Sequence, residues 1–169
     1  MKAWSQWAWD TVYLIALCSI VLITSSTGYA KPLDDQVNNA LMSWAVLLSG
    51  YAVPQKLPDM IQVKHSYLET NACGGKSCNV LGLYDGQNTV YLDDRMKLDS
   101  VAEKSIVVHE FVHFLQKKSG VFGASCQDAI AQEREAYAVQ QEFLTRHGIY
   151  YLVGTALHFS SCDKIYLKE

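Results

Sequence analysis

Apolar residues recur at helical spacing between residues 34 and 50. The apolar stripe comprises Val37, Ala40, Leu41, Trp44, Leu47, Leu48 and Tyr51. Positions three and four apart share one face of a helix, so this stripe can pack against a core. Asp34 or Asp35 can cap the helix and Gly50 can end it. We expect Trp44 to be a core residue.

Three shorter segments have the apolar pattern of strands. Residues 60–64 (MIQVK) alternate, and the runs 79–84 (NVLGLY) and 88–92 (NTVYL) are rich in strand-forming residues. Asp85 and Gly86 separate the last two runs and favour a tight turn, so these runs are expected to form a hairpin. The Cys-Gly-Gly loop is expected to follow the first strand.

Two further helices are predicted after the hairpin. The segment from Ser100 to Glu103 (SVAE) has the form of a capping box, and Gly120 can end the helix that it starts. A last long helix is expected from near Ser125 to near Gly148, followed by a partly helical tail. The order of helix, small sheet, helix and helix predicts an α+β domain.

Composition agrees with one globular domain. The chain has 169 residues, half of them apolar, which is enough for a single core. The formal net charge is −3 and no basic run occurs, so a nucleic acid is not an expected partner.

The first thirty residues have the form of a secretory signal peptide. Lys2 precedes an uncharged, mostly apolar run at residues 11–24, and small or polar residues lead to Ala30, where cleavage is expected. The run is shorter than the roughly 20 residues that span a bilayer. We therefore expect loss of residues 1–30, one domain over residues 31–169, and a location in a bacterial periplasm or outside the cell. The alternative is an uncleaved membrane anchor.

Four of the five cysteines lie after the predicted signal peptide. They are Cys73, Cys78, Cys126 and Cys162. An even number in an exported chain favours two disulfides, which could pair in three ways. We expect one disulfide to close the loop CGGKSC and the other to join Cys126 to Cys162. A four-cysteine zinc site is the alternative, but the chain has no C-x2-C pair.

The strongest chemical signal is the segment VVHEFVH in the middle of the predicted SVAE helix. His109 and His113 lie one helical turn apart on one face, where both imidazoles can reach one zinc ion. Glu110 lies beside His109 and can accept a proton from a water on that ion. Apolar residues surround the three, and buried polar side chains need partners. The segment therefore predicts a zinc site rather than a solvated helix face.

A catalytic zinc ion needs a third protein ligand. The extended motif H-E-x-x-H-x-x-G-x-x-H is excluded, because Gln116 occupies the glycine position. A glutamate on the last helix is the other option, and helical phase favours Glu133 over Glu135. Glu133 shares a face with Ile130, Tyr137 and Leu144. Glu135 is expected on the solvent face with Glu142 and Arg146.

The HEFVH motif, followed by a helix with the sequence EREAYA, resembles the gluzincin metallopeptidases. The resemblance covers residues 100–144 and is greatest to small exported bacterial proteins of uncharacterised function with the same two helices. In gluzincins a glutamate on the second helix is the third ligand, which implies Glu133 here. Several gluzincin families have an aspartate four residues later. Tyr137 stands at that place, and either its hydroxyl supports a histidine or its ring simply packs.

The resemblance implies a zincin-like fold and a zinc-dependent peptidase acting on peptide or protein substrates. Zn²⁺ would polarise the scissile carbonyl and acidify its bound water, with Glu110 as general base. The oxyanion donor is left open among Tyr137, Tyr150, Tyr151 and His158. Residues 89–92 are the candidate edge strand for a substrate, although ordinary sheet pairing is the simpler role of each. His65 and His147 are expected to be surface or structural residues.

Two other classes of function stay open. An exported protein could bind zinc without catalysis, in a structural or partner-binding role, since so short a domain has little room for a second lobe. Alternatively, the chain could be a disulfide-bonded interaction domain in which the HExxH motif is a coincidence. Metal content and the dependence of turnover on Glu110 distinguish the three.

Overall fold

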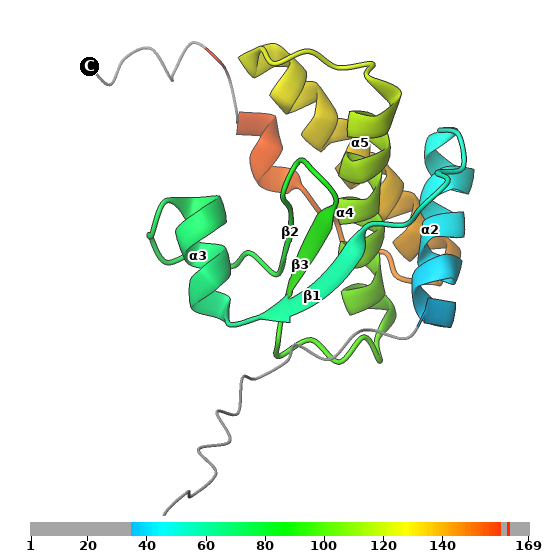
Figure 1. Ribbon diagram of the computed structural model, residues 1–169, viewed down its shortest axis with the longest axis horizontal. Coiled ribbons are helices and arrows are strands. Elements are labelled where there is room, and N and C mark those ends of the chain that lie inside the picture. The colour runs from blue at the N-terminus through cyan, green and yellow to red at the C-terminus, as the bar shows by residue number, and fades with distance from the viewer. Residues whose placement is uncertain (1–34, 160–161, 163–169) are drawn as a thin grey trace, which may run out of the picture.

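The computed structural model describes residues 35–159 and residue 162. Its elements are α2 (Asp35–Ser49), β1 (Asp59–Val63), α3 (His65–Cys73), β2 (Gly82–Tyr84), β3 (Thr89–Asp93), α4 (Val101–Ser119), α5 (Cys126–Arg146) and the 3-10 helix η1 (Thr155–Phe159). The expected α+β class is confirmed, with helices beside one small sheet (Figure 1). The predicted signal peptide lies outside the described residues.

The described strands form one mixed sheet in the order β1-β3-β2. β2 and β3 are antiparallel, as the predicted hairpin requires, and Gly86 in their turn has a φ of +76°. β1 runs parallel to β3, with Met60 opposite Val90. β3 is therefore the central strand, and the prediction that residues 89–92 form an edge is wrong. The edges are β1 and β2.

The helix α3 was not predicted. It follows β1 directly and ends at Gly74, which has the left-handed φ of +60°. It buries only Leu68 and has no side-chain cap at Lys64, so neither an apolar stripe nor a start signal marks it in the sequence. It forms part of the connection that a parallel β1–β3 pair requires, because parallel strands cannot be joined by a tight hairpin.

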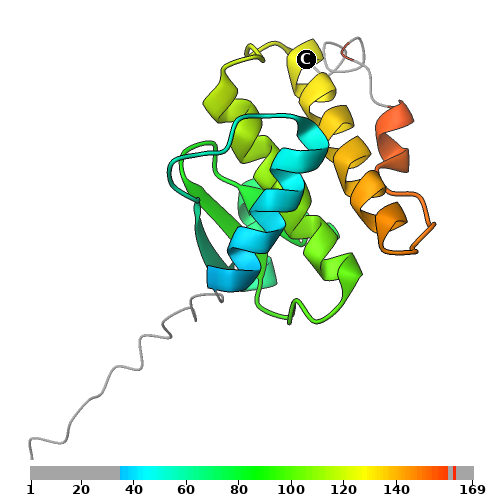
Figure 2. The ribbon, with the colours of Figure 1, turned by 90° about the vertical axis from the view of Figure 1, so that its right-hand side faces the viewer.

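The helix α4 is the centre of the domain. It packs against α5, α2 and β2, and Figure 2 shows α2 crossing in front of α4 with α5 alongside. Ser100 and Glu103 form the predicted capping box, and Gly120 ends α4 in the left-handed conformation. The fully buried aromatic and aliphatic residues around α4 are Val90, Leu92, Val107, Val108, Phe111, Val112, Phe114, Leu115, Phe143 and Leu144.

The buried face of α2 differs from the predicted stripe. Leu41 is buried and Trp44 packs on the core as expected, but Ala40 and Leu47 are exposed. The buried residues of α2 are Asn38, Leu41, Met42 and Ala45. Because α2 packs against both α4 and α5, its buried face is rotated relative to the stripe.

Both predicted disulfides are present. Cys73 is bonded to Cys78, and Cys126, the first residue of α5, is bonded to Cys162. Such bonds form and persist in oxidising compartments, so they agree with an exported chain. The tail is partly helical, as expected, because η1 lies within it. Within the described part of the chain, no helix is both long and apolar enough to cross a bilayer.

Candidate metal centre

The helices α4 and α5 bring the three predicted ligands together. Nε2 of His109 and Nε2 of His113 are 3.1 Å apart. The Glu133 carboxylate lies 3.5 Å from the His109 nitrogen and 3.3 Å from the His113 nitrogen. Helical phase in the sequence therefore favoured Glu133, the glutamate that lies beside both histidines in the structure.

This arrangement fits a metal ion. A tetrahedral zinc ion with ligands at about 2.0–2.1 Å spaces them about 3.3 Å apart, which is close to the three observed separations. Two imidazoles and one carboxylate are a common donor set for such ions, and they leave a fourth position open. His109, His113 and Glu133 can therefore bind one metal ion.

His109 is held by packing. Its Nδ1 atom is buried and has no hydrogen-bond partner among the described residues. The ring of Tyr137 lies against it, with ring centroids 4.4 Å apart. Gly154 lies on Tyr137, since a Cβ at residue 154 would be 2.4 Å from the Tyr137 Cγ. Tyr137 therefore packs on a ligand histidine, one of the two roles left open for it.

His113 is held by hydrogen bonds. Its Nδ1 atom is 2.9 Å from the side-chain oxygen of Gln116. The Gln116 amide nitrogen donates to the carbonyl oxygen of Gln132 and to the carboxylate of Glu135, each at 2.9 Å. Glu135 also accepts a hydrogen bond from the Tyr51 hydroxyl at 2.8 Å. The expectation that Glu135 faces solvent is wrong, because Gln116 in α4 and Tyr51 in the segment after α2 donate to it on that side of α5.

Glu110 lies between the ligands and the sheet. Its carboxylate accepts a hydrogen bond from the backbone N–H of Tyr84 in β2 at 2.9 Å. Gly82, two residues before Tyr84 in β2, lies against the same carboxyl group. A Cβ atom at residue 82 would be 2.8 Å from both Cγ and Oε1 of Glu110. β2 therefore approaches Glu110 closely at a residue without a side chain.

Burial and charge shift the acidity of these groups in the metal-free chain. Burial raises the pKa of the Glu110 carboxyl above its ordinary value. Burial alone would lower the pKa of His113, but the Glu133 and Glu110 carboxylates reverse this and raise it. Burial alone would raise the pKa of Glu133, but both histidines hold it well below its usual range. The charged form of Glu133 is therefore favoured beside the two imidazoles.

The ligands open onto a hollow of about 770 Å³. Its walls come from β2, α4, α5 and the end of α3. Lining residues include Asn71, Gly82, Tyr84, Lys117, Phe122 and Gln132. Glu133 is 42% exposed through its side chain, so the centre can be reached from solvent.

Two of the predicted oxyanion donors do not line this hollow in the described part of the structure. Tyr150 and Tyr151 are exposed, 76% and 51%, and do not line it. The backbone of His158 lies in η1, and its side chain is outside the described part of the structure. Among the three candidates whose side chains are described, Tyr137 is the one that lines the hollow.

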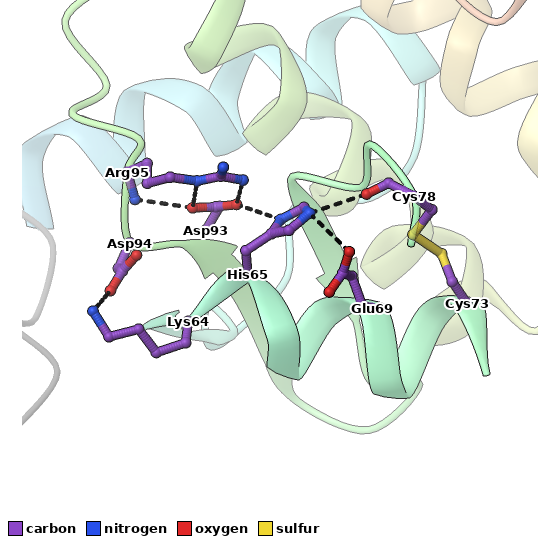
Figure 3. A network of polar contacts seen from close by, with 8 residues as sticks. All are labelled: Lys64, His65, Glu69, Cys73, Cys78, Asp93, Asp94 and Arg95. Atoms are coloured by element: carbon purple, nitrogen blue, oxygen red, sulfur yellow. Dashed lines mark hydrogen bonds and ion pairs between the residues drawn. A yellow bond between two sulfur atoms is a disulfide. The ribbon is translucent and has the colours of Figure 1, made fainter. Parts of the chain in front are cut away.

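A second polar network supports one wall of the hollow. Nδ1 of His65 is 2.7 Å from the Asp93 carboxylate, and Nε2 is 3.0 Å from the carbonyl oxygen of Cys78 (Figure 3). Arg95 donates to the same buried carboxylate. His65 is thus a structural residue, as expected, and it links β3 to the disulfide loop after α3. His147 is also structural, since its ring packs against Trp44 and Phe143.

The fold and the site define an α+β domain with a candidate metal centre on two adjacent helices. The chain belongs to the family described as Domain of unknown function (DUF6647), whose model matches residues 30–162. No curated protein and no solved structure matches the chain.

Proposed function

We propose that this protein is an exported zinc-dependent metallopeptidase with a zincin-like arrangement of sheet and helices. The main support is the convergence of His109, His113 and Glu133 beside the carboxyl group of Glu110. Two histidines, one carboxylate and an adjacent acidic residue at an open hollow form the constellation that metal-assisted hydrolysis needs. The two disulfides support a final location in a periplasm or outside the cell.

His109, His113 and Glu133 would hold the zinc ion. When bound, zinc would polarise a substrate carbonyl and lower the pKa of a water molecule. Glu110 takes a proton from that water onto its carboxylate and delivers it to the leaving nitrogen of the peptide.

The strand β2 is the proposed binding edge for the peptide. The carbonyl of Leu81 and the N–H of Asp85 bond to β3, so the backbone groups of Gly82 and Tyr84 point away from it. An extended peptide can add to such an edge through main-chain hydrogen bonds. The N–H of Tyr84 then has to exchange its bond to Glu110 for one to the substrate.

Metal content is the first test. The oxidised chain should contain one zinc per molecule by elemental mass spectrometry, and Glu133→Gln should lose most of it. Glu142→Gln is the matched control, because Glu142 lies on the same helix in an exposed pair with Arg146. A folded, oxidised chain without zinc would refute the metal centre.

Cleavage is tested with Glu110→Gln. This variant should bind zinc like the wild type but cleave a generic protein substrate roughly 100-fold or more slowly, the size of general acid–base catalysis. If the wild type binds zinc but has no cleavage activity that depends on Glu110, the peptidase function is refuted and the protein is a zinc-binding protein only.

A further inference from the structure

Gln116 is a buried amide one helical turn after His113. It is only 1% exposed and is one of the largest fully buried side chains, although it is polar. All of its described hydrogen bonds are to protein groups: the His113 ring, the Gln132 carbonyl and the Glu135 carboxylate. A buried amide with three bonds has a defined orientation, because each end must meet a complementary group.

The partners on α5 fix which end of the amide points where. A backbone carbonyl and a carboxylate can only accept hydrogen bonds, so the NH₂ group of Gln116 must face Gln132 and Glu135. Turning the amide over would place its oxygen against two acceptors. The oxygen of Gln116 therefore faces His113.

That orientation decides the tautomer of His113. The oxygen of Gln116 accepts a hydrogen bond, so Nδ1 of His113 must carry the proton. The proton of a neutral imidazole is on one nitrogen only, so Nε2 keeps its lone pair. Nε2 is the atom that lies 3.3 Å from Glu133.

Tyr51 completes the chain of contacts. Its hydroxyl donates to the same oxygen of Glu135 that accepts from Gln116. Burial, followed by the contact with Glu135, raises the pKa of Tyr51 to about 12, so the hydroxyl stays a donor at ordinary pH. The Glu135 carboxylate thus accepts from Tyr51, in the segment after α2, and from Gln116 in α4.

We propose that Gln116, oriented by Gln132 and Glu135, is the positioning residue that holds His113 with its Nε2 lone pair directed at the metal. This inference rests on the proposed metal centre but not on peptidase activity. His109 has no such partner, since its Nδ1 atom makes no described hydrogen bond. The two ligand histidines are therefore positioned by different means, one by an amide and one by the ring of Tyr137.

The direct test is nitrogen NMR on the wild-type full chain. With zinc bound, His113 should carry a slowly exchanging proton on Nδ1 that contacts Gln116, and its Nε2 should carry none. Zinc bound through Nδ1, with no proton facing Gln116, would overturn the proposal, and this test needs no substituted variant.

Zinc affinity supplies the second readout. Gln116→Met keeps the length of the side chain but removes the amide, and it should weaken zinc binding 10–100-fold in competition with a chromophoric chelator. Gln140→Met is the matched control, because Gln140 is also buried and bonds from α5 to Ser105 in α4. Gln140→Met should lose as much unfolding free energy as Gln116→Met, but its zinc affinity should stay near that of the wild type.

The outcomes separate this inference from the proposed function. Equal zinc affinity of Gln116→Met and wild type would overturn the positioning role with the metal centre intact. Equal loss in both methionine variants would also overturn it, since the cause would be general destabilisation. A Gln116-dependent zinc site without proteolysis would support the positioning role and refute the peptidase.

Discussion

A Cβ atom at residue 82 would lie 2.8 Å from the Glu110 carboxyl group and 3.0 Å from Ile106. The backbone of Gly82 lies in a regular antiparallel pair, opposite Leu92, and its φ is not positive. Alanine is therefore compatible with the local backbone, and its nearest conflicts are with those two side chains. Gly82 is thus required by the position of the proposed base rather than by a turn.

We expect Gly82→Ala to displace the Glu110 carboxyl group and to lower proteolytic turnover roughly 100-fold, because small misplacements of a catalytic group have effects of this size. Zinc content should not change, since the three ligands lie on other elements. Turnover and bound zinc measured on the same sample check this prediction. Activity equal to wild type would show that Glu110 does not need its observed position.

The packing of Tyr137 on His109 leads to a second prediction at the residue scale. Tyr137→Ala should weaken zinc binding about tenfold, because the ring that supports His109 is lost. Tyr137→Phe keeps the ring and should bind zinc like the wild type. Chelator competition on both variants is the measurement. If turnover but not zinc affinity falls in Tyr137→Phe, the hydroxyl has the separate oxyanion role.

Local sequence rules were sufficient to select the three candidate ligands that lie together, but not the residues that support them. His109 and His113 are one turn apart, and the phase of one helix selected Glu133. Gln116 and Glu135 are 19 residues apart, and Tyr51 is 84 residues from Glu135. No local pattern contains such pairs, because they arise only when α4, α5 and the segment after α2 pack together.

Among the helices and strands, those with signals inside their own segment were predicted, and features that depend on distant contacts were not. The α4 boundaries follow from a capping box and a terminal glycine, both within the segment itself. The parallel pairing of β1 with β3 depends on contacts 30 residues apart along the chain, from Asp59 to Thr89, and no turn signal marks it. α3 could not be predicted from the sequence, because a helix that buries only Leu68 has no apolar stripe.

The anchoring of α3 depends on a buried carboxylate and has a predictable response to acid. The hydrogen bond from Arg95 contributes most to lowering the pKa of Asp93, which falls from 3.8 to about 2. Because the folded state binds this proton less readily than the unfolded state, Asp93 stabilises the fold above about pH 4. This contribution is lost as the pH falls from 4 towards 2.

Asp93→Asn should therefore lower the free energy of unfolding by about 1–2 kcal/mol at pH 6, a range reduced from the full shift because Arg95 is largely exposed. The difference from wild type should narrow as the pH falls from 4 to 2. Urea unfolding at several pH values measures it. Asp94→Asn serves as control, since Asp94 pairs with the exposed Lys64. A difference that does not change with pH would contradict this account.

For the whole molecule, the two disulfides constrain very different lengths of chain. The Cys73–Cys78 bond spans 5 positions and the Cys126–Cys162 bond spans 36. The longer bond joins the start of α5 to the segment after η1. A cross-link removes more freedom from the unfolded chain when its loop is longer.

We expect the double variant Cys126→Ser/Cys162→Ser to lose about 4 kcal/mol of unfolding free energy, and Cys73→Ser/Cys78→Ser to lose about 2 kcal/mol. Urea unfolding of the two oxidised variants beside wild type provides the comparison. The opposite order would mean that the short bond acts on the native wall of the hollow rather than on the unfolded chain.

Because the candidate ligands lie on two helices, folding must precede formation of the complete metal site. Glu133 reaches the histidines only after α5 has docked on α4, so the unfolded chain offers two histidines four residues apart and no complete site. For a chain exported in the unfolded state, as the proposed function implies, the complete candidate site would form only after the chain has crossed the membrane. The metals outside the cytoplasm would then determine which ion the site binds.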